Sequence, residues 1–382
     1  MHKLIFFLIV IVFFSCSNHS DNYDNTKNLT SDTVSTSVKY AKGFSITYHN
    51  NFRILKVFNP WQGACNVQYQ YVLADNPKKV SKKYSKIQII KTPVKKVVCL
   101  STTHIAFIDF IDETNSIIGV SNIKFINNKN VNKLYQKNKI VEVGYDQNLN
   151  YELIISLKPD LIITYGVDNK SVSYINKLKE FGIPVIINAE YLEHEPLAKA
   201  EWVKFIAAFY NKSDLANKKF DIVVNEYNKL KHITDTITQK PSVITGLPWK
   251  DTWYVPGGKS FAAQFLYDAG ANYLFSDDAS RESLALDIET VFAKAQKADY
   301  WINIGTANKI DDIINVDIRL KNFYALSNKN VYNNNAVFNK YGGNDYWESG
   351  IVNPQIILKD LIHIFHPDIF SDYNLYYYKK IY

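Results

Sequence analysis

NYELIISLKPDLIITYG, at residues 150–166, decides the fold, because its pattern returns at residues 287–305 as DIETVFAKAQKADYWINIG. Each copy predicts a short helix with an acidic residue on its first turn, then a turn that ends in Asp, and then an apolar strand that stops at a glycine. The acidic residues are Glu152 and Glu289. Such a repeat indicates two similar α/β lobes, each with one glutamate at an equivalent position.

The length of the chain also favours two lobes. At 382 residues it exceeds the roughly 250 to 300 residues at which a single hydrophobic core stops growing. From residue 93 onward, apolar runs alternate with stretches that have helical periodicity, which predicts two mostly parallel, Rossmann-like sheets covered by helices. The predicted strands are 97–100, 117–120, 161–164 and 185–187 in the first lobe, and 243–245, 273–275, 300–304 and 331–332 in the second.

The remaining segments give the predicted domain order. A long helical stretch at 196–237, with a capping-type break at 211–214, connects an N-terminal lobe at 93–195 to a C-terminal lobe at 238–382. Short β-type runs at 45–48, 52–57 and 69–73 predict a small N-terminal β addition over 38–92. An amphipathic helix near 354–365 closes the second lobe.

The N-terminus is typical of an exported protein. A basic start and an apolar run too short to span a bilayer predict a signal peptide at 1–15. Cys16 follows Ser15, which resembles a lipoprotein lipidation site, although Phe13 and Phe14 are bulky for one; an ordinary cleavage site is the alternative. The polar stretch 16–37 is then expected to be a disordered tether. Cys65 and Cys99 could be free thiols or a disulfide, with a buried free thiol favoured for Cys99.

The charge distribution argues against a nucleic-acid partner. The formal net charge of +7 comes from lysines interleaved with acidic residues, without the basic stripe that such a partner requires. Arginine is scarce, since only Arg53, Arg281 and Arg319 are present. Tyrosine is abundant, at 27 residues, and its amphipathic ring suits binding surfaces as well as cores.

Ligand-binding residues are expected just after the strands, because ligands of open parallel sheets bind beyond the carboxyl ends of the strands and often between domains. The loops at these positions combine aromatic rings with hydroxyl and amide groups, which suits a large, polar-rimmed ligand. For any single ring, packing in the core is the alternative. The candidates are Thr102, Thr103, His104, Tyr145 and Tyr165 in the first lobe, and Trp249, Trp253, Tyr254, Arg281, Tyr341 and Trp347 in the second.

Several other chemistries are disfavoured. The run VPGGKS at 255–260 ends like a phosphate-binding loop, but Trp253 occupies the position of the first glycine. The eight histidines show no zinc-site spacing, so we expect no resident metal or cofactor. Glu152 and Glu289 could be the paired carboxylates of an exported hydrolase, but the repeat places them on separate lobes.

Residues 93–367 resemble the cluster III, helical-backbone substrate-binding proteins of ABC importers, which serve iron siderophores, haem and cobalamin. The resemblance rests on the long helix and on five short motifs: VVCLS at 97–101, YEL at 151–153 with KPDLI at 158–162, VPGGKSF at 255–261 with AGA at 269–271, LKDL at 358–361, and HP at 366–367. It implies that the ligand lies between two lobes whose hinge motion the long helix limits.

The resemblance also implies partners and roles. Glu152 and Glu289 match the glutamates that dock onto arginines of the permease dimer, which works with its ATPase. Tyr165 matches an aromatic contact of cobalamin-binding members, whereas Asp146 stands where those members carry tryptophan. The expected protein is a monomeric, non-enzymatic lipoprotein, anchored through Cys16 on the periplasmic side of the envelope. Its expected ligand is an iron chelate or a cobalamin-like compound, with haem as the alternative.

Overall fold

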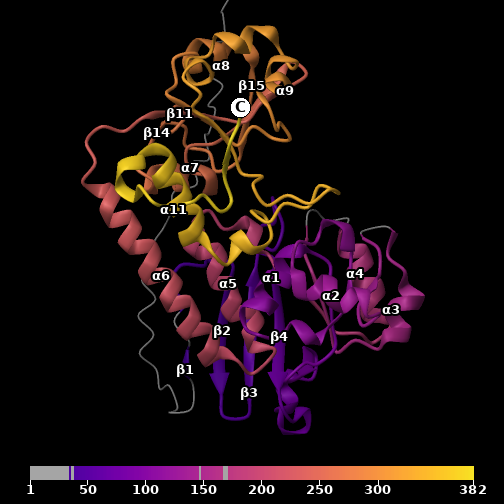
Figure 1. Ribbon diagram of the computed structural model, residues 1–382. Coiled ribbons are helices and arrows are strands. Elements are labelled where there is room, and N and C mark those ends of the chain that lie inside the picture. Colours follow the sequence, from indigo (N-terminus) through magenta and orange to yellow (C-terminus); the bar gives the residue numbers. More distant parts are fainter. Residues whose placement is uncertain (1–33, 36–37, 146–147, 167–170) are drawn as a thin grey trace, which may run out of the picture.

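Two α/β lobes and an N-terminal sheet make up the molecule in the computed structural model, which describes residues 34–35, 38–145, 148–166 and 171–382 (Figure 1). Residues 1–33, including the predicted signal peptide and Cys16, lie outside this description, as does Asp146. Among the described residues, no helix combines the length and the apolar character needed to cross a bilayer.

The N-terminal lobe is built on a parallel sheet in the order β10-β9-β6-β7-β8. Its central strands are almost fully buried and apolar, as expected for a parallel sheet with helices on both faces. The strands are β6 (Val97–Cys99), β7 (Ile117–Val120), β8 (Val141–Glu142), β9 (Leu161–Thr164) and β10 (Val185–Ile187); the helices are α1 (Thr102–Phe110), α2 (Lys129–Gln136), α3 (Tyr151–Leu157) and α4 (Ser171–Glu180).

The C-terminal lobe has a second sheet in the order β14-β11-β16-β17-β18, parallel except for the last strand. The strands are β11 (Ser242–Thr245), β14 (Asn272–Tyr273), β16 (Tyr300–Ile302), β17 (Val331–Asn333) and β18 (Lys379–Lys380). Its helices are α7 (Phe261–Asp268), α8 (Ile288–Ala295), α9 (Ile310–Ile314), α10 (Tyr324–Ser327) and α11 (Pro354–Phe365).

The two sheets confirm the predicted fold class and explain the sequence repeat. In each lobe the strand that follows the repeated helix, β9 or β16, pairs with the first strand of that lobe, β6 or β11. The next strand, β10 or β17, adds to its outer side. The order β10-β9-β6-β7 therefore matches β17-β16-β11-β14, and α3 and α8 occupy equivalent places.

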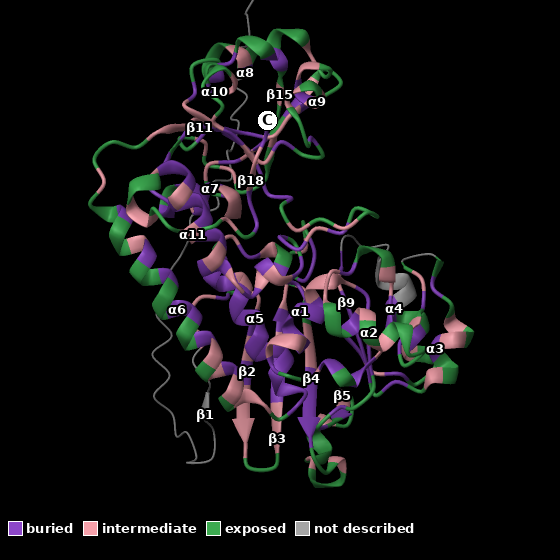
Figure 2. Cartoon of the chain, in the orientation of Figure 1, coloured by how far each residue is buried: buried purple, intermediate pink, exposed green. Residues whose placement is uncertain are grey.

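The connecting stretch forms two helices, α5 (Pro196–Ala208) and α6 (Ser213–Asp235), separated at the predicted break, where Asn211 has a left-handed φ of 58°. Helix α5 is buried almost throughout (Figure 2). Helix α6 buries only one stripe, which includes Phe220, Val223, Tyr227 and Leu230, as its helical spacing requires. The prediction of a helical connection is confirmed, but its first half is a central core element.

The N-terminal sheet packs against α5 through Phe44, whose ring centroid lies 4.8 Å from that of Trp202 and 5.6 Å from that of Phe205. Strands β1 to β4 are antiparallel and β5 adds in parallel to β4. The strands are β1 (Val34–Ser35), β2 (Phe44–His49), β3 (Phe52–Phe58), β4 (Gln68–Ala74) and β5 (Gln88–Lys91). Strand β1 lies inside the stretch 16–37 predicted as a tether and pairs with β2; the rest of that stretch lies outside the described residues.

A small antiparallel sheet, which the sequence did not predict, covers part of the C-terminal lobe. It consists of β12 (Pro248–Trp249), β13 (Thr252–Pro256) and β15 (Ser283–Asp287).

Both described cysteines are free thiols, Cys65 exposed and Cys99 buried. Short 3-10 helices complete the chain: η1 (Pro77–Lys79), η2 (Lys82–Tyr84), η3 (Thr114–Ser116), η4 (Ile123–Phe125), η6 (Glu190–Leu192), η7 (Ile318–Asn322), η8 (Ser349–Ile351) and η9 (Pro367–Phe370).

Candidate functional site

The carboxyl ends of the two parallel sheets face each other, and we call the surface between them the inter-lobe face. The clearest evidence is contact between the segment after β17 and the segment after β7. Asn339 Nδ2 donates a hydrogen bond to the carbonyl oxygen of Lys124 at 2.9 Å. The carboxylate of Glu348 accepts from the backbone N–H groups of Asn127 at 2.6 Å and Asn128 at 2.9 Å.

Thr102 and Thr103 lie on this face because β6 ends at Cys99 and α1 begins immediately afterwards. Ser101 caps the helix, and its Oγ accepts from the Thr103 backbone N–H at 3.3 Å. Both threonines are partly exposed. The Thr102 hydroxyl, beside the helix N-terminus, is available to an acceptor-rich ligand, whereas the Thr103 hydroxyl contacts Ser101 Oγ at 3.0 Å and Glu190.

His104 is placed differently from the prediction. Its side chain is fully buried, 6.5 Å from the Tyr165 ring between centroids. Burial lowers the pKa of His104 to about 3, so the imidazole is neutral. Helical geometry turns this residue inward, away from Thr102 and Thr103, and it cannot touch a ligand directly in this structure.

The two tyrosines of the first lobe follow β9 and β8, which are separated by β6 and β7 in the sheet. Tyr165 directly follows β9 and is partly exposed. Tyr145 follows β8 and exposes 52% of its surface. Each presents an aromatic ring beyond the carboxyl end of a strand, as the sequence predicted.

In the second lobe, the aromatic residues predicted as ligand contacts on β12 and β13 do not all face the same side of the sheet. Trp249 and Tyr254 point outward, with 64% and 50% of their surface exposed. Trp253 is fully buried; its indole N–H donates to the Thr245 carbonyl at 3.0 Å, and its ring packs on Trp301. Successive strand residues face opposite sides, so Trp253 and Tyr254 cannot both line one surface. The expectation that Trp253 contacts ligand is therefore wrong for this structure.

Tyr341 and Trp347 belong to the segment after β17 that touches the N-terminal lobe. They expose 50% and 58% of their surface. The ammonium group of Lys124 lies 5.8 Å from the Tyr341 ring centroid, across the inter-lobe face. The rings of Tyr346 and Trp347 pack edge to face at 4.7 Å, with Tyr346 buried and Trp347 outside.

Arg281 is exposed and lines a pocket of about 200 Å³ that lies between the entry to α5 and the C-terminal lobe. Lys42, Lys259 and His194 line the same pocket. Burial, followed by the charges of Arg281, Lys199 and Lys42, lowers the pKa of His194, against the charge of Glu282. Glu193 and Glu195 line the same pocket, so it carries charges of both signs.

Two ionisable residues near the carboxyl ends of the N-terminal sheet, Glu190 and Lys199, were not among the predicted site residues. Glu190, just after β10, is fully buried, and burial raises the pKa of its carboxyl group, against a hydrogen bond from Thr103. Burial lowers the pKa of Lys199 to about 8, while the charge of Glu190 opposes that shift. The only sequence signal was the position of Glu190 after a strand, because Lys199 reaches the site from α5.

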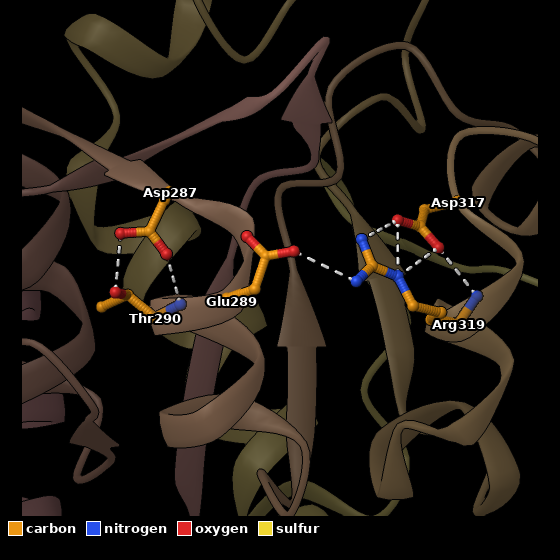
Figure 3. A network of polar contacts seen from close by, with 5 residues as sticks. All are labelled: Asp287, Glu289, Thr290, Asp317 and Arg319. Carbon is orange, nitrogen blue, oxygen red and sulfur yellow. Dashed lines mark hydrogen bonds and ion pairs between the residues drawn. The ribbon is translucent and has the colours of Figure 1, made fainter.

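The two glutamates of the repeat are exposed on the first turns of α3 and α8. Glu289 forms an ion pair with Arg319 at 3.2 Å, and Arg319 pairs with Asp317 at 2.6 Å (Figure 3). Among the described side chains, Glu152 has no such ion-pair partner. The repeat thus gives two exposed carboxylates, one of which already binds a guanidinium group.

Within the described part of the chain, no group of three or more His, Cys, Asp or Glu side chains is arranged to hold a metal ion.

Comparison with known proteins agrees with this architecture. The sequence profile of the periplasmic binding protein family matches residues 97–336, which is more than half of the chain. A lipoprotein of Methanocaldococcus jannaschii is 28% identical over 386 residues, covering 95% of this chain and 90% of the relative. The chain therefore belongs to the periplasmic binding protein family.

Solved structures share the fold at low sequence identity. A possible iron-binding, periplasmic solute-binding protein from Staphylococcus epidermidis is 18% identical with a TM-score of 0.55, covering 73% of this chain and all of that one. The periplasmic vitamin B12 binding protein of Vibrio cholerae is 14% identical with a TM-score of 0.51, covering 74% of this chain and 99% of that one. About a quarter of the present chain thus has no counterpart in either structure.

Proposed function

We propose that this chain is the substrate-binding component of an ABC importer, which captures a metal chelate between its lobes and delivers it to a membrane permease. One observation carries the proposal: both lobes present large aromatic rings that expose half or more of their surface. Amphipathic rings of this kind are typical of binding surfaces. They are Tyr145, Trp249, Tyr254, Tyr341 and Trp347.

The proposed ligand is an iron chelate of the siderophore type or a cobalamin-like compound. Both are large molecules with apolar faces and a polar rim, and exposed rings beside the hydroxyls of Thr102 and Thr103 suit them. The iron-binding and vitamin B12 binding descriptions of the similar structures support this choice. Haem is the alternative, and because His104 is buried, an iron ligand would then be Tyr165 or another tyrosine.

We further propose that Glu152 and Glu289 dock the two lobes onto arginines of the permease. The Glu289–Arg319 pair shows that this carboxylate is placed to accept a guanidinium group. The proposed protein is a monomeric lipoprotein, attached through Cys16 on the periplasmic side of the cell envelope, without a resident cofactor. The rival function, a carboxylate hydrolase, is disfavoured because Glu152 and Glu289 stand on different lobes.

The ligand class is tested by titrating the full chain, with Cys16→Ser to prevent lipidation, with a ferric hydroxamate, cyanocobalamin and haem. Tryptophan fluorescence should fall to a plateau, with a dissociation constant of about 1 μM or tighter for one of them. The Trp249→Phe and Trp347→Phe variants should each lose part of the quenching, because both rings are exposed in the proposed site. If none of the three binds more tightly than about 1 mM, the ligand class is wrong.

The docking role is tested separately. Glu152→Gln and Glu289→Gln should leave ligand affinity unchanged and abolish uptake by cells that carry the permease. A hydrolase would instead lose turnover on Glu152→Gln, and impaired ligand binding with normal permease docking would contradict the docking assignment.

A further inference from the structure

The loop between β3 and β4, residues 59–67, extends from the N-terminal sheet to the edge of the N-terminal lobe. Nine residues, 59 through 67, separate these two antiparallel neighbours, although two to five would be enough. Trp61 anchors the loop: it is 9% exposed and belongs to the same buried cluster as Val98 and Leu100 of the lobe. A long loop held in this way has a fixed position.

The loop rests on the carboxyl ends of β9 and β10. A Cβ atom on Gly166, just after β9, would lie 3.3 Å from the Pro60 carbonyl oxygen and 3.4 Å from a ring carbon of Trp61. Tyr191, after β10, donates its hydroxyl hydrogen to the Gly166 carbonyl and accepts from the backbone of Gln62. Both strands thus end against this loop, on the inter-lobe face.

The side chain of Gln62 continues to the opposite lobe. Its Nε2 donates a hydrogen bond to the carboxylate of Glu282, which precedes β15 in the C-terminal lobe. Glu282 follows Arg281, which lines the pocket beside the entry to α5. One loop that belongs to neither lobe therefore contacts both of them, where the proposed ligand would bind.

The exposed tip of this loop offers uncharged polar groups. Gln62, Gly63, Cys65 and Asn66 are exposed, and the primary amides can both donate and accept hydrogen bonds. Tyr191, 38% exposed, adds an aromatic surface beside them. Such a surface complements the oxygen-rich rim of a chelate and leaves its apolar face to the rings of the two lobes.

We propose that residues 59–67 form a third wall of the ligand site, contributed by the N-terminal sheet, and that Gln62 hydrogen-bonds to the polar rim of the bound chelate. The inference rests on the proposed function. It lies outside the region that defines the family, because the family profile begins at residue 97.

Cys65 provides the first test, because the chain has only three cysteines and Cys99 is buried. In the Cys16→Ser chain, an environment-sensitive fluorophore on Cys65 should respond to whichever probe quenches tryptophan: ferric hydroxamate, cyanocobalamin or haem. Its midpoint should equal that of the tryptophan signal. The matched control carries the label at the other end of β3, as Asn50→Cys with Cys65→Ser, and should not respond. A saturating tryptophan signal with a silent Cys65 label would overturn the third wall.

The second test concerns Gln62 itself. Gln62→Ala should weaken binding of the same probe about fivefold, the worth of one hydrogen bond. Gln68→Ala removes an exposed amide at the start of β4 and should leave affinity unchanged. Equal affinities for the wild type and Gln62→Ala would refute the role of this side chain.

The third test needs no ligand. A double-mutant cycle of Gln62→Ala and Glu282→Ala should show a coupling of about twofold in the equilibrium constant for unfolding, as expected for an exposed contact to a charge. Zero coupling would count against the contact between Gln62 and Glu282 and hence against the third wall. If no probe quenches tryptophan, the proposed ligand class fails, and this cycle then tests the contact between the loop and the second lobe.

Discussion

Two of the contacts that the C-terminal lobe makes across the inter-lobe face differ in kind. After β7 and β17, Glu348 is 2% exposed, and its carboxylate accepts from two backbone N–H groups. Beyond β9 and β10, the exposed amide of Gln62 meets the exposed carboxylate of Glu282. The first contact holds a buried side chain against the backbone of the opposite lobe, whereas the second joins two exposed side chains, either of which water or a ligand could replace.

The energetics follow from burial. An exposed contact between a polar group and a charge contributes about 0 to 1 kcal/mol, because water competes for both partners. At the buried contact, the neighbouring backbone also leaves little room: a Cβ on Gly343 would lie 2.4 Å from the Phe125 carbonyl oxygen. The Glu348 contact should therefore hold the relative position of the lobes, and the Gln62 contact should adjust.

The largest expected effect is a dependence of the folding stability on pH, caused by the carboxyl group of Glu348. Burial, with a smaller contribution from the charge of Asp345, raises the pKa of its carboxyl group to about 7, against the hydrogen bonds from Asn127 and Asn128. The folded state thus binds this proton more tightly than the unfolded state, so stability falls as pH rises from about 4.5 to about 7. Because each tenfold difference in proton affinity between the two states corresponds to about 1.4 kcal/mol, the expected loss of stability is about 3 kcal/mol.

This effect is measured as the difference between wild type and Glu348→Gln in urea unfolding at pH 5 and pH 8. The buried His104, whose pKa is lowered, destabilises the folded state as pH falls below about 6.5, but it is present in both proteins and cancels. The wild type should lose stability relative to the variant between the two pH values. A constant difference would show that Glu348 titrates normally.

The next largest expected effect is the difference in stability between a variant of the buried contact and a variant of the exposed contact. At pH 5.5, Glu348→Ala should lower the free energy of unfolding by about 2 kcal/mol, because two partly buried backbone N–H groups lose their acceptor. Glu282→Ala removes the corresponding acceptor at the exposed contact and should cost less than about 0.5 kcal/mol. Equal losses in chemical denaturation would contradict the distinction between a fixed and an adjustable contact.

A smaller effect is expected beside the buried contact. Asn339 donates to the Lys124 carbonyl, and its side-chain oxygen accepts from the backbone N–H groups of Tyr341 and Gly343. Asn339→Ala should therefore cost about 1 kcal/mol, and Asn339→Asp should restore part of it because the acceptor remains. If thermal denaturation shows no loss for Asn339→Ala, the segment after β17 is not held by this side chain.

The fold was predictable from the sequence because the repeat and the alternation of apolar runs are local patterns. Every predicted strand of the two lobes is present, and the helix predicted near 354–365 is α11. The β12-β13-β15 sheet was missed, since Trp249, Pro248 and the turn after them are typical of a loop. Its strands pair across a separation of about thirty residues, and such pairing leaves no periodic signal.

The candidate site was less predictable, because the sequence places a residue after a strand but does not say which way its side chain points. His104 and Trp253 turn inward, while their neighbours Thr103 and Tyr254 are partly or largely exposed. Glu348 and Gln62 were not predicted at all. Each acts through a residue more than 200 positions away, and only the assembled fold brings such partners together.

The variant with the smallest expected loss of stability, Gln62→Ala, should show the clearest loss of ligand affinity. Gln62→Ala should change the free energy of unfolding by less than about 0.5 kcal/mol, because its partner Glu282 is exposed and water can replace the amide. Glu348→Ala should instead lose much of its stability. At a pH where this variant is folded, it should keep its ligand affinity. Parallel unfolding curves and fluorescence titrations of the two variants measure both quantities. If Gln62→Ala lowered stability as much as Glu348→Ala, the loop 59–67 would be a structural connection between the lobes. The proposal that Gln62 exchanges its contact with Glu282 for a contact with the ligand would then be contradicted.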